Sequence, residues 1–250
     1  MHLIVYGDFN CPYSYLASQR ADALVRAGRA EVEWRAVEHD RRLALTGTRS
    51  SSDPARWQRE LAEVAALAGP DEQAPGAAPA LVSNTGAAVA ACAEAVADGV
   101  EDELRRSLFS EIWVRLRHVS GPYEVRQLVR ALMYPAGPPG EPLAVPDLPA
   151  RIHHHAAPGT LPRLSGCTIS PAGGPLTVGG HRRIGQWRRE WLSGSGGVVP
   201  ALSLPDGMLT GPAALACLAD LAAAAPAGAA APAGAAASAA AGPLVASGVG

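Results

Sequence analysis

Two residues that could do chemistry, Cys11 and Ser14, stand three positions apart where an apolar segment gives way to a helical pattern, in the stretch YGDFNCPYSYLAS. A cysteine at a helix start lies beside unpaired backbone N–H groups and the positive end of the helix dipole, and both favour a thiolate. Pro12 suits the first helical position because it has no N–H to leave unpaired. The hydroxyl of Ser14 can point at the sulfur. The stretch therefore indicates a nucleophilic thiol, with a pKa below the usual value of about 8.5.

Ser14 cannot close an intramolecular disulfide with Cys11. In a C-x-x-C pair the second thiol resolves a mixed disulfide quickly. Here that step would need a small-molecule thiol, a partner protein or a distant cysteine. The alternative is an inert cysteine buried at a strand end, since unpaired cysteines are often core residues.

The composition is that of a soluble globular protein, with 250 residues, 48% of them hydrophobic, and a net charge of −2. This charge gives no strong field for nucleic acid or an anionic membrane, and neither is expected as a partner. We find no secretory signal pattern and no run of about 18 strongly apolar residues, so we expect a cytoplasmic protein. Thiols stay reduced there, and a disulfide framework is not predicted for the four cysteines, Cys11, Cys92, Cys167 and Cys217.

The segments on both sides of Cys11 predict a β-α-β unit. Residues 2–8 predict a short buried strand, and residues 12–27 predict a helix that ends at Gly28. Residues 31–37 alternate polar and apolar types, which is typical of a strand with one wet face at a sheet edge. Because a helix connects the two strands, we expect them to be parallel.

The remaining chain predicts a helical insertion and then a return to the sheet. The insertion, residues 50–134, contains predicted helices over 54–68, 85–98, 101–118 and 122–133. After it we predict a Pro/Gly-rich irregular connection over 135–179, a helix over 181–193, a strand over 198–204, a return strand over 208–210 and a last helix over 211–224. Residues 225–250 are rich in Ala, Gly and Pro and predict a disordered tail.

Without the insertion, the element order is β-α-β followed by α-β-β-α. This is the thioredoxin order. We therefore predict an α/β protein with a thioredoxin-like domain over 1–40 and 180–224, interrupted by an inserted helical domain.

The quoted stretch also resembles a known family. Its part Asp8-Phe9-x-Cys11-Pro12-Tyr13-Ser14-Tyr15-Leu16-Ala17 resembles the D-F-x-[SC]-P-Y-S-Y-L-A segment of DsbA-like thioredoxin proteins. The branch in question contains 2-hydroxychromene-2-carboxylate isomerases, kappa-class glutathione transferases and FrnE-type oxidoreductases. Weaker similarities lie in the insertion, at Asn84-Thr85-x-x-Ala88 and Leu108-Phe109-x-x-x-Trp113. The resemblance covers roughly residues 2–133 and 180–224.

The resemblance implies a role for the residues that surround the thiol. Pro200 would be a cis proline that faces Cys11, and the backbone of Val199 would pair with the substrate. The alternative for Pro200 is a trans proline in an edge strand. Pro12, Tyr13 and Asn84 would also contact substrate, although the position of Asn84 equally suits a helix N-cap.

The chain departs from that branch in two ways. Its isomerases and transferases usually have serine where this chain has Cys11, and its dithiol oxidoreductases have cysteine where this chain has Ser14. Kappa-type enzymes use polar residues at the start of the last helix to hold glutathione, but this chain reads Gly211-Pro212-Ala213-Ala214. We therefore expect no tightly bound cofactor, and a low-molecular-weight thiol as a possible co-substrate.

Other residues invite a function less strongly. His153, His154 and His155 could suggest a metal site, but no acidic or cysteine ligand stands at regular spacing near them, so no metal is expected. Cys167 could resolve a mixed disulfide or be an ordinary loop cysteine. His39 could line a cleft beside the insertion or be a solvated histidine at a strand end.

Three functions are compatible with these observations. The leading one is a thiol-disulfide oxidoreductase that attacks a small disulfide or mixed disulfide through Cys11, with Ser14 as a catalytic neighbour. The second is a thiol-dependent isomerase or transferase of a small aromatic electrophile. The third is a non-catalytic thioredoxin-like binding protein. The sequence does not predict the oligomeric state.

Overall fold

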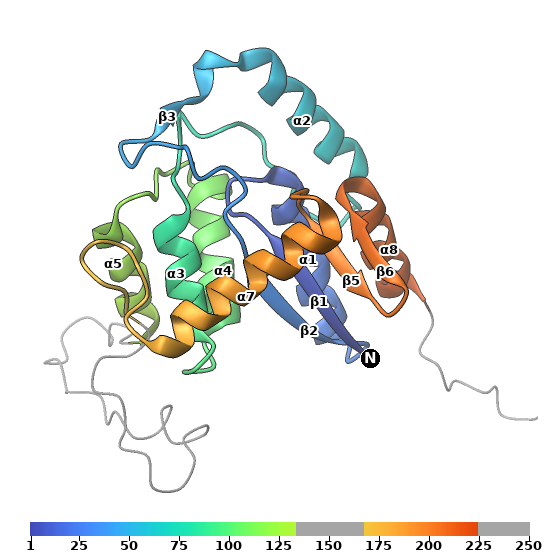
Figure 1. Ribbon diagram of the computed structural model, residues 1–250. Helices are drawn as coiled ribbons and strands as arrows, with labels where there is room; N and C mark the ends of the chain where they lie inside the picture. The colour runs from blue at the N-terminus through green and yellow to red at the C-terminus, as the bar shows by residue number, and fades with distance from the viewer. Residues whose placement is uncertain (134–167, 225–250) are drawn as a thin grey trace, which may run out of the picture.

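A four-stranded mixed sheet lies at the centre of the protein in a computed structural model that describes residues 1–133 and 168–224 (Figure 1). The strand order is β2-β1-β5-β6. The strands are β1 (His2–Gly7), β2 (Glu31–Ala36), β5 (Ala201–Leu204) and β6 (Gly207–Thr210). β1 runs parallel to β2 and antiparallel to β5, and β6 pairs antiparallel with β5. The predicted parallel pair and the edge position of β2 are confirmed.

Helices cover both faces of this sheet. They are α1 (Pro12–Arg26) and α8 (Gly211–Ala223) on one face and α7 (Val178–Ser195) on the other. Figure 1 shows α7 crossing in front of the strands, with α1 and α8 behind them. α1 buries Leu16, Ala17 and Leu24 completely, as its helical spacing requires. It ends before Gly28, whose φ of +64° suits glycine.

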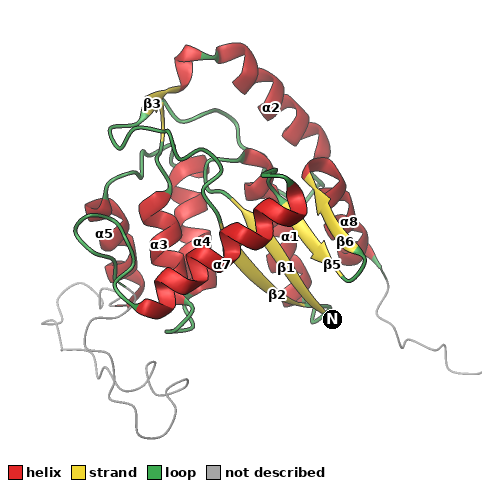
Figure 2. Cartoon of the chain, in the orientation of Figure 1, coloured by secondary structure: helices red, strands yellow, loops and turns green. Residues whose placement is uncertain are grey.

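The helical insertion follows β2, and Figure 2 shows that helices form most of it. Its helices are α2 (Pro54–Leu67), α3 (Gly86–Ala95), α4 (Glu101–Phe109) and α5 (Pro122–Met133). The single helix predicted over 101–118 is wrong in its second half, because α4 passes into a π-helical turn, Ser110–Val114. We did not predict the small sheet of β3 (Thr48–Arg49) and β4 (Leu81–Val82), whose strands are too short to leave a pattern.

A buried arginine joins the insertion to α1. Arg105 of α4 donates to Asp22 of α1 at 2.6 Å and to the carbonyl of Ser18 at 3.1 Å. Its guanidinium also lies 5.2 Å from the centre of the Trp34 ring. A buried cation must be paired in this way, because an unpaired one would cost several kcal/mol. α4 is thereby fixed against the first helix.

A second arginine joins α1 to the end of α2. Arg20 donates to both carboxylate oxygens of Glu72, at 2.7 and 2.8 Å, and to the carbonyls of Leu67 and Leu215, each at 2.7 Å. Its side chain is 6% exposed. The planar guanidinium suits such a set of acceptors, and it holds α1, α8 and the last residue of α2 together.

Several predictions fall outside the described residues. They concern most of the irregular connection, the C-terminal tail, the three adjacent histidines and Cys167. Within the connection, residues 168–177 are described and form loop and turns before α7 begins.

Candidate functional site

A tight turn between β1 and α1 places Cys11. Gly7 ends β1, and a Cβ atom there would overlap the ring of Trp34, so only glycine fits. Asp8 Oδ1 then accepts a hydrogen bond from the Asn10 N–H at 3.0 Å, which forms an Asx turn. The Cys11 N–H donates to the Asp8 carbonyl at 3.1 Å. The turn sets Cys11 at the N-cap of α1.

The sulfur of Cys11 faces the segment that enters β5. Its Sγ lies 3.8 Å from the carbonyl oxygen of Val199, to which the thiol can donate. The peptide bond between Val199 and Pro200 is cis, which confirms the predicted isomer. The Pro200 carbonyl accepts a hydrogen bond from the N–H of Gly211 at 2.8 Å. Segments far apart in the sequence therefore meet beside the thiol.

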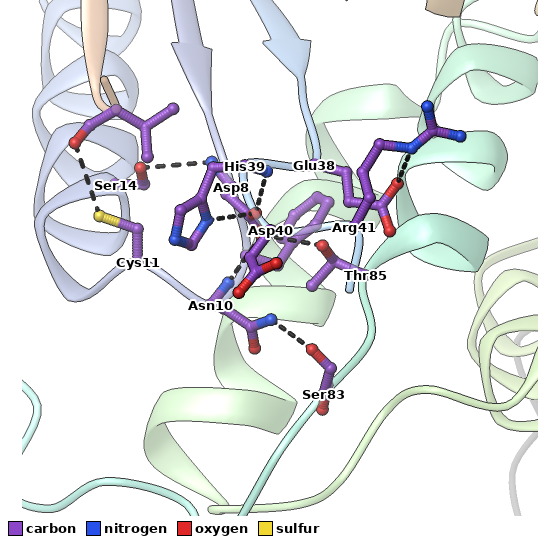
Figure 3. A network of polar contacts seen from close by, with 12 residues as sticks. Asp8, Asn10, Cys11, Ser14, Glu38, His39, Asp40, Arg41, Ser83 and Thr85 are labelled. Carbon is purple, nitrogen blue, oxygen red and sulfur yellow. Dashed lines mark hydrogen bonds and ion pairs between the residues drawn. The ribbon is translucent and has the colours of Figure 1, made fainter. Parts of the chain in front are cut away.

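Ser14 lies in the first turn of α1 and is fully buried. Its Oγ accepts a hydrogen bond from the Asp8 N–H at 3.3 Å. The hydroxyl is also close enough to the Cys11 sulfur to lower the pKa of the thiol. Ser14 thus connects the turn to the sulfur (Figure 3).

Burial raises the pKa of Cys11 to about 11. The residue is 9% exposed, and removal from water disfavours the thiolate. The hydroxyl and N–H of Ser14 and the N–H of Tyr13 act in the opposite direction, while the carboxylate of Asp8 raises the pKa further. Our expectation of a lowered pKa is therefore wrong for this arrangement, because burial outweighs the donors at the start of α1.

Asp8 is the centre of a buried polar network (Figure 3). It is 1% exposed, and its two carboxylate oxygens have four partners. Oδ1 accepts from the Asn10 N–H and from the Thr85 hydroxyl at 2.9 Å. Oδ2 accepts from the His39 N–H at 2.7 Å and lies 2.6 Å from His39 Nδ1. These contacts satisfy a buried charge that would otherwise be costly, and they connect β1, the end of β2 and the start of α3.

The ring of His39 is paired with Asp8, and its side chain is 29% exposed. Burial alone would lower the pKa of His39, but the hydrogen bond and the charge of Asp8 outweigh burial, and the pKa is raised. His39 follows the end of β2 and keeps an exposed edge, as expected for a strand-end histidine, but its ring is paired with a buried carboxylate. A carboxylate on Nδ1 orients the ring and leaves Nε2 as the second position for proton exchange.

Tyr13 connects the start of α1 to α2. Its hydroxyl donates to the carboxylate of Glu63, and both burial and this carboxylate raise the pKa of Tyr13. Arg56, in the first turn of α2, lies within electrostatic range of the Cys11 sulfur. The next residue, Trp57, packs against Trp113 with ring centres 6.1 Å apart. α2 is therefore joined to the start of α1 at Glu63 and brings the charge of Arg56 within range of the thiol.

The remaining predicted site residues are divided between two places. Pro12 is buried in the first turn of α1, beside Cys11. Asn84 is not the N-cap of α3, which is Thr85, but lies one residue before it: its Oδ1 accepts from the Gly86 N–H at 3.0 Å, and its Nδ2 donates to the Leu43 carbonyl at 2.7 Å. These contacts occupy the Asn84 side chain with two backbone groups, one at the start of α3 and one in the segment after β2.

Our sequence reasoning missed the roles of Asp8, Asn10 and Thr85. Only Asp8 leaves a local signal, because a carboxylate directly after an apolar strand needs partners if it is buried. Thr85 and His39 are far from Asp8 in the sequence, and nothing in their neighbours indicates a shared contact. Asn10 donates through its amide to the Ser83 carbonyl and so adds a further connection to the insertion.

Two other features bear on the site. Within residues 1–133 and 168–224, no group of three or more His, Cys, Asp or Glu side chains could hold a metal ion. Among the helices of these same segments, none is both long and apolar enough to cross a membrane.

Solved structures with the same fold carry different activities. The chain is similar to a 2-hydroxychromene-2-carboxylate isomerase (TM-score 0.52, 19% identity, covering 88% of this chain and 93% of that one). It is also similar to a probable DsbA oxidoreductase from Streptomyces coelicolor (TM-score 0.54, 14% identity, covering 87% of this chain and 86% of that one). A third similar structure is that of the cytosolic disulfide reductase DsbM from Pseudomonas aeruginosa with glutathione (TM-score 0.51, 13% identity, covering 84% of this chain and 89% of that one). At these identities the likeness shows the fold alone.

Sequence comparison gives the family. No curated protein matches the chain. The profile described as the DSBA-like thioredoxin domain matches residues 2–133, more than half of the chain, and these residues include the whole turn around Cys11. With the sheet order, the helical insertion and the cis proline in place, the chain belongs to the DSBA-like thioredoxin domain family.

Proposed function

We propose that this protein is a thiol-disulfide oxidoreductase that acts through Cys11 alone. The observation that carries the proposal is the position of the Cys11 sulfur, at the N-cap of α1 and 3.8 Å from the Val199 carbonyl. A disulfide substrate bound along the Val199 backbone would place its sulfur next to this thiol. The DSBA-like family of the chain supports the same class of reaction.

The proposed reaction has two exchange steps. The Cys11 thiol loses its proton and attacks one sulfur of the substrate disulfide, and the other sulfur leaves as a thiolate that takes up a proton. This step forms a mixed disulfide on Cys11. An external thiol then loses its proton and attacks the substrate sulfur of the mixed disulfide, so that this half of the substrate leaves as a new disulfide and the Cys11 sulfur takes up a proton. Electrons pass from the external thiol to the substrate, and none remain on the protein.

The external thiol is needed because Ser14 occupies the position of a second cysteine. We propose a low-molecular-weight thiol for this role. The glutathione in the DsbM structure supports a small thiol as the chemical class. Since that neighbour is described as cytosolic, it also supports our expectation of a cytoplasmic reaction. Cys167, the other candidate for resolving the mixed disulfide, remains a prediction.

The raised pKa of Cys11 constrains this mechanism. At neutral pH only about one thiol in ten thousand is ionised when the pKa is about 11. The donors that would stabilise a thiolate, from Ser14 and Tyr13, are already present, so burial is the main obstacle. Attack should therefore follow a rearrangement that brings water or substrate to the sulfur, and the adjacent α2 is the element that would move.

A second function is favoured by the same observation. A thiol that stays protonated can act as a hydrogen-bond donor to the sulfur of a bound small thiol, in place of a serine hydroxyl. This would make the protein a thiol-dependent isomerase or transferase of a small aromatic electrophile, in which Cys11 positions the external thiol without forming a disulfide. The isomerase among the solved neighbours supports this alternative.

Trapping separates the two functions. Incubation with bis(2-hydroxyethyl) disulfide, followed by acid quench and peptide mass spectrometry, should give a mixed disulfide on Cys11 that added thiol removes. Cys11→Ser should show no adduct at that position. The oxidoreductase proposal fails if wild-type Cys11 stays unmodified at pH 9 while the unfolded chain reacts. The isomerase alternative instead requires thiol-dependent turnover that survives Cys11→Ser.

A further inference from the structure

A cavity of about 440 Å³ lies between the end of β2, α3 and α7, apart from the thiol. Small-molecule sites typically enclose about 300–1,000 Å³, so the cavity is large enough for a ligand. Neither Cys11 nor Ser14 is among the residues that line it. In Figure 3 two lining residues, Glu38 and Arg41, lie on the other side of Asp8 from Cys11.

Much of the cavity wall is apolar. Hydrophobic side chains come from Val37, just after β2, from Val89 and Ala90 of α3, and from Ile184 of α7. Leu45 lines the cavity and is 63% exposed. Exposed leucines are common singly, but this one continues the apolar wall toward solvent. The wall therefore suits the hydrocarbon part of a small molecule.

The charged lining is mainly positive. Arg41 and Arg188 face a single lining carboxylate, that of Glu38. Arg41 pairs with Glu38 at 3.3 Å. Arg188 donates from Nη1 to the backbone carbonyl of Glu38 at 3.3 Å, and among the described residues no carboxylate lies within ion-pair distance of its guanidinium. A guanidinium has five N–H donors, so Arg188 retains capacity to bind an anion.

The carboxylate of Glu38 is offset by the neighbouring arginines, one of which pairs with it. Burial, and secondarily the charge of Asp8, raise the pKa of Glu38, although Arg41 and Arg188 act in the opposite direction. The start of α3 adds positive potential, because Gly86 and Ala87 line the cavity at the N-terminal end of that helix. The two lining arginines outnumber the single lining carboxylate, and together with the start of α3 they favour an anionic ligand over a cationic one.

We propose that this cavity binds a small amphipathic anion, a carboxylate with a compact apolar body. Arg188 would hold the carboxylate, and the hydrocarbon part would lie against Val89, Ala90 and Ile184. The site is separate from the thiol, so binding goes beyond the proposed thiol-disulfide exchange. The Asp8 network connects the two, because His39 follows Glu38 and Thr85 precedes Gly86.

Octanoate is a suitable probe for this site. Titration of the full ¹⁵N-labelled protein should give saturable shifts of the glycine amides at the cavity, those of Gly86, Gly173 and Gly174. Calorimetry should show that octanoate binds at least about tenfold more tightly than octan-1-ol or octylamine, which match its length but lack the negative charge. Equal binding of the three ligands, or octanoate shifts that lie elsewhere in the protein, would overturn the proposal.

A pair of arginine variants tests whether Arg188 binds the carboxylate of octanoate. Arg188→Gln should weaken octanoate binding about tenfold, the effect of one charge-assisted hydrogen bond. Arg189→Gln, on the same helix but exposed and outside the cavity lining, should bind as the wild type does. Equal affinity of the Arg188→Gln variant and the wild type would overturn the assignment. If Arg188→Gln does not fold, the three-ligand comparison on the wild type still decides.

A cysteine variant separates this proposal from the proposed function. Cys11→Ser should bind octanoate as the wild type does, even though it cannot form a mixed disulfide. Loss of octanoate binding in Cys11→Ser would contradict a separate site. Failure of the trapping experiment would leave the octanoate result unaffected.

Discussion

The carboxylate of Asp8 and the imidazole of His39 meet at 2.6 Å, although 31 positions separate them in the chain. This contact fixes the segment after β2 against the turn that carries Cys11. Asp8 also lies close enough to Cys11 to raise the pKa of its thiol. One buried carboxylate therefore influences two titratable groups beside the site.

Asp8→Asn should show how much the Asp8 charge contributes to the raised pKa of His39. Asparagine is isosteric but carries no charge, so the pKa of His39 should fall toward or below its ordinary value of about 6.5. Since a raised His pKa stabilises the fold below about pH 6.5, and this contribution is lost as pH rises through the folded pKa, the variant should lose stability mainly on the acid side. NMR titration of the His39 ring measures its pKa, and urea unfolding at pH 5.5 and 8 measures the change in unfolding free energy. Asp206→Asn, at an exposed turn, should change neither quantity.

The buried thiol should make the protein sensitive to alkali. Because the pKa of Cys11 rises from 9.0 to about 11 on folding, its contribution to stability is present below about pH 9 and is lost as pH rises toward 11. The loss should amount to about 2–3 kcal/mol. The difference in unfolding free energy between wild type and Cys11→Ser, measured from pH 7 to 11, isolates this effect. A constant difference would contradict the raised pKa.

Tyr13→Phe should make the thiol more accessible. The change removes the hydrogen bond to Glu63 that holds α2 beside α1. A hydrogen bond of about 1 kcal/mol would shift a local opening equilibrium about fivefold. The rate of Cys11 alkylation by iodoacetamide at pH 8 should rise by that factor. Tyr123→Phe provides the matched control, because Tyr123 is 70% exposed on α5; an equal rise there would contradict a specific role for Tyr13.

Ser14→Cys should remove the need for an external resolving thiol. Residues three apart in a helix lie close together on its surface, so the new thiol can attack a mixed disulfide on Cys11 and close an intramolecular disulfide. After treatment with bis(2-hydroxyethyl) disulfide, mass spectrometry should find a loss of two hydrogens instead of an adduct. In the double variant Cys11→Ser, Ser14→Cys, the new thiol lacks its partner at position 11, so this bond should not form. A persistent adduct in the single variant would contradict the expected geometry.

Gly7→Ala should destabilise the protein strongly. The added methyl group would overlap the ring of Trp34 in the core, and overpacking of this kind costs about 1–3 kcal/mol or more. Gly76→Ala is the control, because a Cβ atom there meets nothing within 4 Å. Thermal unfolding of the two variants measures the difference. Similar melting temperatures for both would show that the β1–α1 turn can shift to admit a side chain.

Local patterns in the sequence were enough to predict the scaffold of the site. The alternation over 31–37 and the apolar run before Cys11 predicted β2 and β1, and Pro12 and Gly28 marked the limits of α1. These signals are strong because each arises from neighbours within one element. The cis bond before Pro200 came from the resemblance, since no local pattern distinguishes it from a trans bond.

The electrostatics of the site could not be predicted in the same way. The helix start suggested a lowered pKa for Cys11. Burial raises this pKa instead, and the burial of Cys11 depends on segments far away in the sequence. The partners of Asp8 likewise come from three separate elements. The π-helical turn after Phe109 was missed because its residues continue the helical spacing of α4.

The contacts of Arg20 have a mechanical consequence for access to the thiol. They fasten the last residue of α2, Leu67, to α1 and α8, whereas Arg56, near the thiol, lies at the other end of the helix. A helix held at one end cannot slide away as a unit. We therefore expect any displacement of α2 to be a rotation about its Leu67 end, where the Arg20 guanidinium holds it, and not a translation of the whole helix.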